Sequence, residues 1–215
     1  MAGKRRVALA VDTATAELTA DDLVLADALW RRGIEVRPMV WGSEQATRSD
    51  VVVIRSTWDY VERVDEFRSW FDDLDTARVE VGPGGSAPHV ARLLESDDVL
   101  VQPFVTEIET DGEVSVIAIG GVVTHAVEKR SAAGEWRVQS DFGGSVTRVD
   151  VTHAHRRAVA SVLSAVDGTP GYARVDLVAI GGVLHLMELE LIEPDLFFRL
   201  APEAAERLAG RLVGG

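Results

Sequence analysis

The chain has 215 residues, 47% of them hydrophobic and 27% charged, and its 35 acids against 22 bases give a formal net charge of −13. This composition is typical of a globular protein. The acidity argues against nucleic acid as a main partner, because phosphate backbones attract basic surfaces. Cysteine is absent, which excludes disulfides, thiolate metal sites and a cysteine nucleophile.

The first apolar run, Val7 to Val11, is too short for a signal sequence, and Asp12 ends it. No apolar stretch in the sequence approaches the roughly 20 residues that a membrane span needs. We therefore expect a cytoplasmic protein with no membrane partner.

The first 74 residues alternate between strand and helix patterns. The predicted strands cover residues 6–11, 35–41 and 50–56, and the predicted helices cover residues 20–32 and 61–74. Thr19 is a plausible N-cap of the first helix, and the second helix places Phe67, Trp70 and Phe71 on one stripe. The alternation predicts a small N-terminal α/β domain over residues 1–74.

Residues 75–215 follow a second pattern, in which strands separated by Gly-rich turns indicate an antiparallel sheet. The predicted strands cover residues 75–81, 99–104, 114–119, 122–129 and the end of 138–149. The predicted helices cover residues 90–94, 152–166 and 202–212. We expect an α+β domain over this region.

Acidic residues interrupt two apolar strands near the C-terminus, at Asp176, Glu188 and Glu190. A carboxylate inside an apolar strand is costly to bury unless something pairs with it. Magnesium is a natural partner, because hard cations prefer carboxylate oxygens. The three acids therefore predict a metal site, although any one of them alone is as readily explained by an edge position facing solvent.

The turn between these strands carries a geometric condition. Because side chains alternate faces along a strand, a simple two-residue turn at Gly181-Gly182 would put Asp176 on one face with Met187 and turn Glu188 away. Joint coordination by Asp176 and Glu188 needs an odd-length connection or a bulge. We predict a three- or five-residue connection centred on Gly182, where glycine tolerates a positive φ.

Three features follow one another from residue 99 onward. In chain order they are Val101-Gln-Pro-Phe-Val105 with Glu113, then Glu128-Lys-Arg130 with Gly134-Glu-Trp-Arg-Val-Gln139 and Gly143-Gly144, and then the acidic hairpin ending in Glu193-Pro-Asp195. Each motif alone has an ordinary structural explanation. In this order and spacing they resemble the C-terminal half of an ATP-grasp ligase, of the branch with glutathione-synthetase-like enzymes and ribosomal-protein glutamate ligases.

The resemblance implies a role for each matching residue. Gln102, Phe104 and Val105 match the hinge that grips adenine, and Glu113 matches the acid that binds ribose. Arg137 matches the arginine that meets the acyl phosphate. The remaining matches are Gln139, Gly143 and Gly144 beside the substrate, and Asp176, Glu188 and Glu190 as the magnesium ligands. Gln139 and Glu190 each stand where the family pattern has asparagine.

Two further segments resemble the subgroup that contains the D-cycloserine-forming ligase. They are Arg55-Ser-Thr-Trp-Asp-Tyr60 and the stretch from Met187 to Asp195. Arg55 also falls at the C-terminal edge of the first predicted sheet, where ligands of open α/β sheets commonly sit. We predict that Arg55 and Asp195 touch the substrate, while a packing role for Trp58 and Tyr60 is the alternative.

The sequence departs from the ATP-grasp pattern in the middle. These enzymes hold nucleotide between two lobes, and the first lobe normally supplies phosphate-binding lysines and a glycine-rich lid. The only lysines here are Lys4 and Lys129, and the space between Leu74 and Val99 is short for such a lobe. The resemblance therefore implies an ATP-grasp-like domain lacking most of its central lobe, either because the protein is truncated there or because a mobile segment is missing from this sequence.

The resemblance implies an ATP- and Mg²⁺-dependent ligase that activates a small amino-acid-like carboxylate as an acyl phosphate and joins it to an amine-type substrate. It also implies a family in which homodimers are common. Two alternatives stay open: a non-catalytic relic that acts as a binding protein, and a kinase on the same frame. The scarcity of lysine favours the relic, and the intact set of three acids favours the enzyme.

Overall fold

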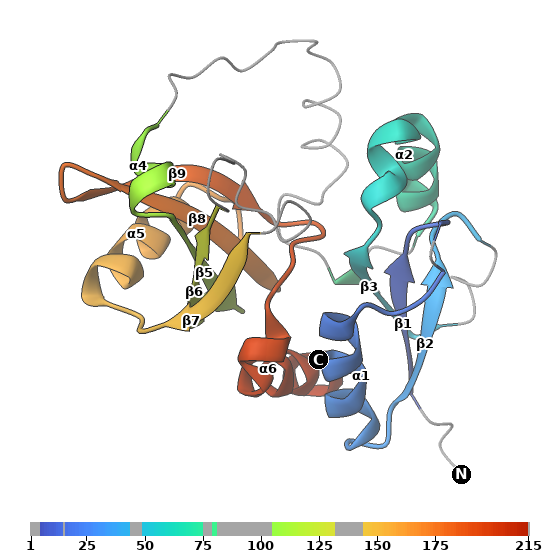
Figure 1. Cartoon of the computed structure of the whole chain (residues 1–215). Coiled ribbons are helices and arrows are strands. Elements are labelled where there is room, and N and C mark those ends of the chain that lie inside the picture. The colour runs from blue at the N-terminus through green and yellow to red at the C-terminus, as the bar shows by residue number, and fades with distance from the viewer. Residues whose placement is uncertain are drawn as a thin grey trace.

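The computed structural model describes residues 5–14, 16–43, 49–74, 79–80, 105–131 and 144–214. Its strands form two sheets that lie side by side, and helix α6 at the C-terminus lies beside helix α1 of the N-terminal part (Figure 1). Among the described residues, no helix has the length and apolar character needed to cross a membrane.

The first sheet has the order β2-β1-β3-β4, and every neighbouring pair is parallel. Its strands are β1 (Arg6–Val11), β2 (Glu35–Val40), β3 (Val51–Ser56) and β4 (Val79–Glu80). All six residues of β3 are buried, as its continuous apolar run predicted. The predicted strand over 75–81 is represented by β4, which joins the N-terminal sheet. The division of the chain at residue 74 stays a prediction.

Helix α1 (Ala20–Trp30) begins at the predicted N-cap. The Thr19 hydroxyl accepts a hydrogen bond from the Asp22 backbone N–H at 3.1 Å, and the Asp22 carboxylate accepts one in return from the Thr19 hydroxyl at 2.8 Å. This reciprocal cap supplies a partner for one of the helix N–H groups that would otherwise lack one. It also fixes the side chain of Asp22 at the helix N-terminus, which matters for the site below.

The opposite face of the first sheet is covered by α2 (Val64–Asp73), which follows a short 3₁₀ turn, η2 (Trp58–Glu62). The predicted stripe of Phe67, Trp70 and Phe71 is buried there against the sheet. The ring centroids of Phe67 and Trp41 lie 5.2 Å apart in an edge-to-face arrangement. Aromatic packing of this kind adds to the area these side chains bury.

The second sheet is antiparallel, with the order β7-β6-β5-β8-β9. Its strands are β5 (Glu113–Ile119), β6 (Val122–Arg130), β7 (Ser145–Val149), β8 (Tyr172–Ile180) and β9 (Val183–Glu190). Helix α5 (His153–Leu163) packs on one face through Val159, which lies in a core with Val116 and Val175. A one-turn helix, α4 (Glu107–Thr110), precedes β5 and was not predicted.

A shared core joins the two parts of the chain. Helix α6 (Pro202–Gly214) and the 3₁₀ turn η6 (Phe198–Leu200) contribute buried side chains to the same cluster as α1, β1 and β3. Buried Tyr172 in β8 places its hydroxyl 2.6 Å from the carbonyl oxygens of both Ile54 and Ile192. The end of β3 is thereby held next to the segment that follows β9.

The hairpin between β8 and β9 corrects the predicted connection. It is a two-residue turn, because Ile180 pairs with Val183 and only Gly181 and Gly182 lie between them, both at positive φ. A β-bulge in β9 leaves Met187 as an extra residue, so Asp176 pairs with Glu188. The prediction of a longer connection was wrong, while the bulge that the sequence had allowed as the alternative is present.

The predicted helix over 90–94, the predicted strand over 99–104 and the region expected to lack the central lobe lie outside the described residues. The lack of the central lobe therefore stays a prediction.

Candidate active site

The acids of the hairpin meet on one face of the second sheet. Asp176 lies opposite Glu188, and Arg174 lies opposite Glu190, in the register of β8 and β9. Directly opposed residues of an antiparallel pair share a face, and residues two apart in one strand do so as well. Arg174, Asp176, Glu188 and Glu190 therefore form one cluster, called here the acidic face.

Arg174 lies at the centre of the acidic face. Its Nε is 3.1 Å from each carboxylate oxygen of Asp176, and its Nη2 is 3.3 Å from Oε2 of Glu188. Nη2 also donates to Glu190. A guanidinium presents several donors in one plane, which suits simultaneous contact with three carboxylates.

A second cation approaches the same face from the middle of the sheet. Lys129 in β6 pairs in register with Glu113 in β5, and its ammonium forms an ion pair with that carboxylate. The Lys129 Nζ also donates to Oδ2 of Asp176 at 3.1 Å. Glu113, predicted as a ribose ligand, is therefore a neighbour of the acidic face, and its role toward ribose stays a prediction.

The electrostatics of the face differ from one acid to the next. Burial works to raise the pKa of Asp176, but the charges of Arg174 and Lys129 prevail and hold it below its usual range. At Glu190, burial and the nearby acids outweigh Arg174 and raise the pKa to about 8. Asp176 is 1% exposed and Glu188 is 56% exposed. The face therefore combines an ionised, enclosed carboxylate at Asp176, a half-exposed carboxylate at Glu188 and, at Glu190, a carboxylate whose charge is incompletely compensated.

The donor chemistry of the acidic face fits a hard divalent cation, since it offers carboxylate oxygens. Among the described residues, however, no three acids or histidines converge on one point, because Arg174 lies between the carboxylates. Mg²⁺ usually takes only one or two carboxylates and completes its shell with water and substrate phosphates. The half-exposed Glu188 and the undercompensated Glu190 are the groups that best meet that requirement.

The remaining nucleotide and phosphate predictions fall mostly outside the described residues, at Gln102, Phe104, Arg137, Gln139 and Gly143. Val105 is described and precedes α4, and Gly144 is described and precedes β7. Their contacts with a ligand stay predictions.

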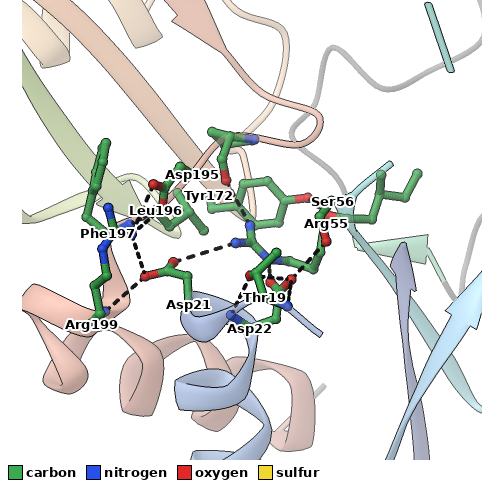
Figure 2. Close-up of polar contacts among 12 residues, drawn as sticks. Thr19, Asp21, Asp22, Arg55, Ser56, Tyr172, Asp195, Leu196, Phe197 and Arg199 are labelled. Carbon is green, nitrogen blue, oxygen red and sulfur yellow. Dashed lines mark hydrogen bonds and ion pairs between the residues drawn. The ribbon is translucent and has the colours of Figure 1, made fainter. Parts of the chain in front are cut away.

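A separate group of charged side chains lies where the two parts of the chain meet (Figure 2). Arg55 at the end of β3 donates from Nε to Oδ1 of Asp22 at 2.7 Å and from Nη1 to the carbonyl of Pro194 at 3.1 Å. Ser56 donates to the other oxygen of Asp22 at 2.9 Å. The side chains of Arg55 and Asp22 are 3% and 0% exposed. Arg55 therefore ties α1 to the segment after β9, and its role as a substrate anchor stays a prediction.

A pocket of about 330 Å³ opens beside this ion pair. Its wall includes Asp21 from the start of α1, Trp58 from η2, and Glu193, Asp195 and Arg199 from the C-terminal segment. The Arg199 guanidinium contacts both oxygens of Asp195, at 3.1 and 3.0 Å, and Oδ1 of Asp21 at 3.3 Å. Asp195, predicted as a substrate contact, thus lines a pocket.

Tyr60 links the pocket with the acidic face. Burial and the hydrogen-bonded carboxylate of Glu193 raise the pKa of Tyr60 to about 12. Glu193 in turn feels the charges of both Arg174 and Arg55, so it lies electrostatically between the two clusters. The Arg55-to-Tyr60 motif therefore joins the N-terminal sheet to both.

Sequence reasoning missed several of these residues. Arg174 stands two positions before Asp176, and the alternation of a strand would have placed both on one face. Lys129 belongs to the Glu128-Lys-Arg130 motif but was assigned no role from the sequence, although its strand neighbours the one carrying Glu113. Asp21 and Asp22 lie in the first turn of α1, where acids are common, and no local signal indicates that they meet Arg55 and Arg199.

Comparisons with known proteins agree with this architecture. A family model described as the N-terminal domain of D-cycloserine synthetase DcsG matches residues 7–81. Over 139 residues the chain is 31% identical to the cycloserine biosynthesis protein DcsG of Streptomyces lavendulae, a match that covers 58% of this chain and 45% of that protein. The matched region therefore spans less than half the length of this relative.

Solved structures extend the likeness of fold over nearly the whole chain. The crystal structure of D-cycloserine synthetase DcsG has a TM-score of 0.74 at 23% identity, covering 96% of this chain and 99% of that chain. The ATP-grasp ligase PsnB, complexed with a phosphomimetic variant of a minimal precursor, Mg and ADP, has a TM-score of 0.50 at 12% identity, covering 97% of each chain. The predicted fold class and the predicted resemblance are both confirmed.

Proposed function

We propose that this chain, which has the fold of the ATP-grasp ligases and is similar in sequence to DcsG, acts as an ATP-dependent carboxylate–amine ligase. The observation that carries the proposal is the acidic face, where Arg174 and Lys129 meet three hairpin acids on one face of the second sheet. A phosphoryl-transfer site needs this mixture, because cations must stabilise phosphate charge while acids hold the accompanying metal.

In the proposed reaction a carboxylate oxygen of the substrate attacks the γ-phosphorus of ATP, and the bond to ADP breaks. An amine-type nucleophile then attacks the carboxyl carbon, phosphate leaves, and the nucleophile loses a proton. Such catalysis depends chiefly on positioning and electrostatic stabilisation. The substrate would be small and amino-acid-like, in keeping with the resemblance.

Arg174 is the residue proposed to meet the transferring phosphoryl group. Its guanidinium is always charged, and burial cannot remove that charge because the neighbouring Asp176 and Glu190 raise its pKa further. Bringing in phosphate oxygens would let Arg174 exchange its contact with half-exposed Glu188 for a contact with the nucleotide. Lys129 is proposed to add a second positive charge, held in place by Glu113 and Asp176.

ATP and Mg²⁺ are the proposed cofactors, and the structure of PsnB, a protein of similar fold, is a complex that contains Mg and ADP. Glu188 and Glu190 are the proposed metal ligands, with Asp176 behind them as the carboxylate that fixes Arg174 and Lys129. Magnesium would neutralise phosphate charge when bound there. The predicted adenosine contacts, Gln102, Phe104, Val105 and Glu113, and the predicted phosphate contact, Arg137, complete the proposed nucleotide site.

Calorimetric titration with Mg-ATP tests the proposal. Wild type is expected to bind, and Arg174→Met and Glu188→Gln are each expected to weaken binding by about tenfold or more, because each removes a charged contact. The matched controls are Arg157→Met and Asp167→Asn, which change exposed side chains elsewhere on the surface. Both controls should bind like wild type.

The outcomes separate the candidate functions. Absent Mg-ATP binding in wild type would reject the nucleotide site and favour a non-catalytic binding protein, for which the scarcity of lysine is the supporting observation. Where binding is found, ADP release is measured across a panel of amino acids. A ligase forms free phosphate with an amide product, whereas a kinase leaves the phosphoryl group on its product.

A further inference from the structure

The pocket beside Arg55 has a wall with more acids than bases. Four carboxylates line it, and two guanidiniums accompany them. The acids are Asp21, Asp22, Glu193 and Asp195, and the bases are Arg55 and Arg199. An excess of negative charge in a partly enclosed space favours a cationic ligand over an anionic one.

The two arginines are already engaged with protein groups. Arg55 is buried and contacts Asp22 and the carbonyl of Pro194. The Nη1 of Arg199 contacts both Asp195 and Asp21. A ligand carboxylate would have to compete with these pairs and would also meet the remaining acids of the wall. This arrangement disfavours binding of a substrate carboxylate by Arg55.

One of the two carboxylate oxygens of Asp21 lacks a hydrogen-bond donor among the described residues. Its side chain is 6% exposed, and Oδ1 accepts from the Arg199 backbone N–H at 2.9 Å. Oδ2 is buried and has no hydrogen-bond partner among the described residues, and the Nη2 of Arg55 lies 3.8 Å from it, beyond hydrogen-bonding range. A buried carboxylate oxygen left without a donor carries a desolvation cost that an incoming donor would offset.

We infer that this pocket binds a primary ammonium group of the ligase's small substrate, with Asp21, Glu193 and Asp195 as its carboxylate partners and Trp58 as an aromatic wall. The inference rests on the proposed function for the identity of the ligand, whereas the preference for a cation rests on the pocket alone. Trp58 lines the pocket and is 51% exposed, and an exposed indole offers a favourable surface for an organic cation.

The electrostatics of two of these acids, Asp21 and Glu193, support this assignment. Burial, with repulsion from Asp195, raises the pKa of Asp21, and burial raises the pKa of Glu193 despite the charge of Arg174. Both carboxyls therefore lack sufficient positive charge around them. An ammonium ligand would supply that charge and would favour the ionised carboxylates.

The chemistry of the pocket also assigns a role to the bound nitrogen. Neighbouring carboxylates stabilise the protonated form of an amine, and a protonated amine has no free electron pair with which to attack an acyl phosphate. The ammonium held here is therefore a recognition group, separate from the nucleophile. The substrate class is a small molecule that carries an ammonium group in addition to the groups that react.

Three probes of similar size and different charge test the inference: 2-aminoethanol, ethylene glycol and glycolate. The readout is the indole N–H signal of Trp58 in ¹⁵N-labelled protein, assigned with Trp58→Phe. In wild type, 2-aminoethanol is expected to bind about tenfold or more tightly than ethylene glycol, since it alone can form a charge-assisted hydrogen bond to a carboxylate. Preferential binding of glycolate would overturn the inference in favour of a carboxylate site.

Asp21→Asn is expected to weaken 2-aminoethanol about tenfold and to leave ethylene glycol unchanged. Asp167→Asn, the control for loss of one exposed negative charge, should retain wild-type affinity for both. Equal binding of 2-aminoethanol by wild type and Asp21→Asn would overturn the role of Asp21. If a variant folds poorly, the affinities of wild type for the three probes still test whether the pocket prefers a cation.

Mg-ATP titration of the same samples separates this inference from the proposed function. Amine binding without nucleotide binding would support the cation pocket and reject the ligase. Nucleotide binding without a preference for the amine would support the ligase and overturn the pocket assignment.

Discussion

Two arginines of this protein are surrounded by acids, but their environments differ. Arg55 and its partner Asp22 are 3% and 0% exposed, and the oxygens of Asp22 accept from Arg55, Ser56 and Thr19. Arg174 shares its guanidinium among three acids, one of which, Glu188, is 56% exposed. A pair whose donors and acceptors are satisfied away from water is suited to holding structure. A guanidinium with a solvent-exposed partner is suited to exchanging that partner for a ligand.

The comparison predicts that the buried pair of Arg55 and Asp22, at the junction of the two parts of the chain, contributes most to stability. Arg55→Met is expected to lower the free energy of unfolding by about 3–5 kcal/mol, because it leaves the Asp22 carboxylate buried without its counter-charge. Arg157→Met, at an exposed helix position, should stay within about 0.5 kcal/mol of wild type. Both are measured by urea unfolding. A loss below about 1 kcal/mol for Arg55→Met would contradict the view that this pair holds the two parts together.

The segment from Glu193 to Phe197 connects the acidic face with the charged residues around Arg55. His125 also contacts this segment. The His125 Nε2 lies 3.0 Å from the Leu196 carbonyl and donates to it, because a carbonyl oxygen only accepts. Burial lowers the pKa of His125 to about 4. The neutral ring therefore stabilises this connection, and the sign of its pH dependence can be worked out.

In the unfolded chain His125 binds a proton near pH 6.5, whereas in the folded protein it is protonated only near pH 4. The stabilisation is complete above pH 6.5 and is lost as the pH falls toward 4, with a total of about 3 kcal/mol. Glu190, whose pKa is raised to about 8, contributes in the opposite direction. The effect is therefore measured as the difference between wild type and His125→Gln in urea unfolding across this range.

In His125→Gln, the free energy of unfolding is expected to rise less steeply between pH 4 and pH 6.5 than it does in wild type. His153→Gln, at an exposed position, should leave the pH profile unchanged. Parallel profiles for wild type and His125→Gln would contradict the assignment.

How well a contact in the fold or the candidate site could be predicted depends on how far apart its two residues lie in the sequence. The pairing of Asp176 with Glu188 followed from strand alternation plus an irregularity, and that irregularity is the bulge at Met187. The turn itself was predicted wrongly, because two adjacent glycines at positive φ form a tight turn without extra residues. Local periodicity thus predicts which side chains share a face, but it does not say which of several irregularities brings them into register.

No comparable signal in the sequence predicts the contacts of Arg55. Arg55 contacts residues 33 and 139 positions away, at Asp22 and Pro194. Such contacts depend on how the two sheets pack, and the sequence records only a helix cap at one end and a polar motif at the other. The motif containing Arg55 was recognised as informative through its resemblance, whereas the structural pairing it makes emerged only from the packing.

The smallest expected effect distinguishes two neighbouring acids at the start of α1. Asp22→Asn should cost about 2–3 kcal/mol, because it weakens charge-assisted contacts with Arg55 and leaves that arginine buried with less compensation. Asp21→Asn should stay within about 1 kcal/mol of wild type, since Oδ1 can still accept from Arg199 and the replaced Oδ2 makes no hydrogen bond. Urea unfolding at pH 7 measures both. A large loss for Asp21→Asn would mean that its carboxylate holds the fold, whereas a small one leaves it available to a ligand.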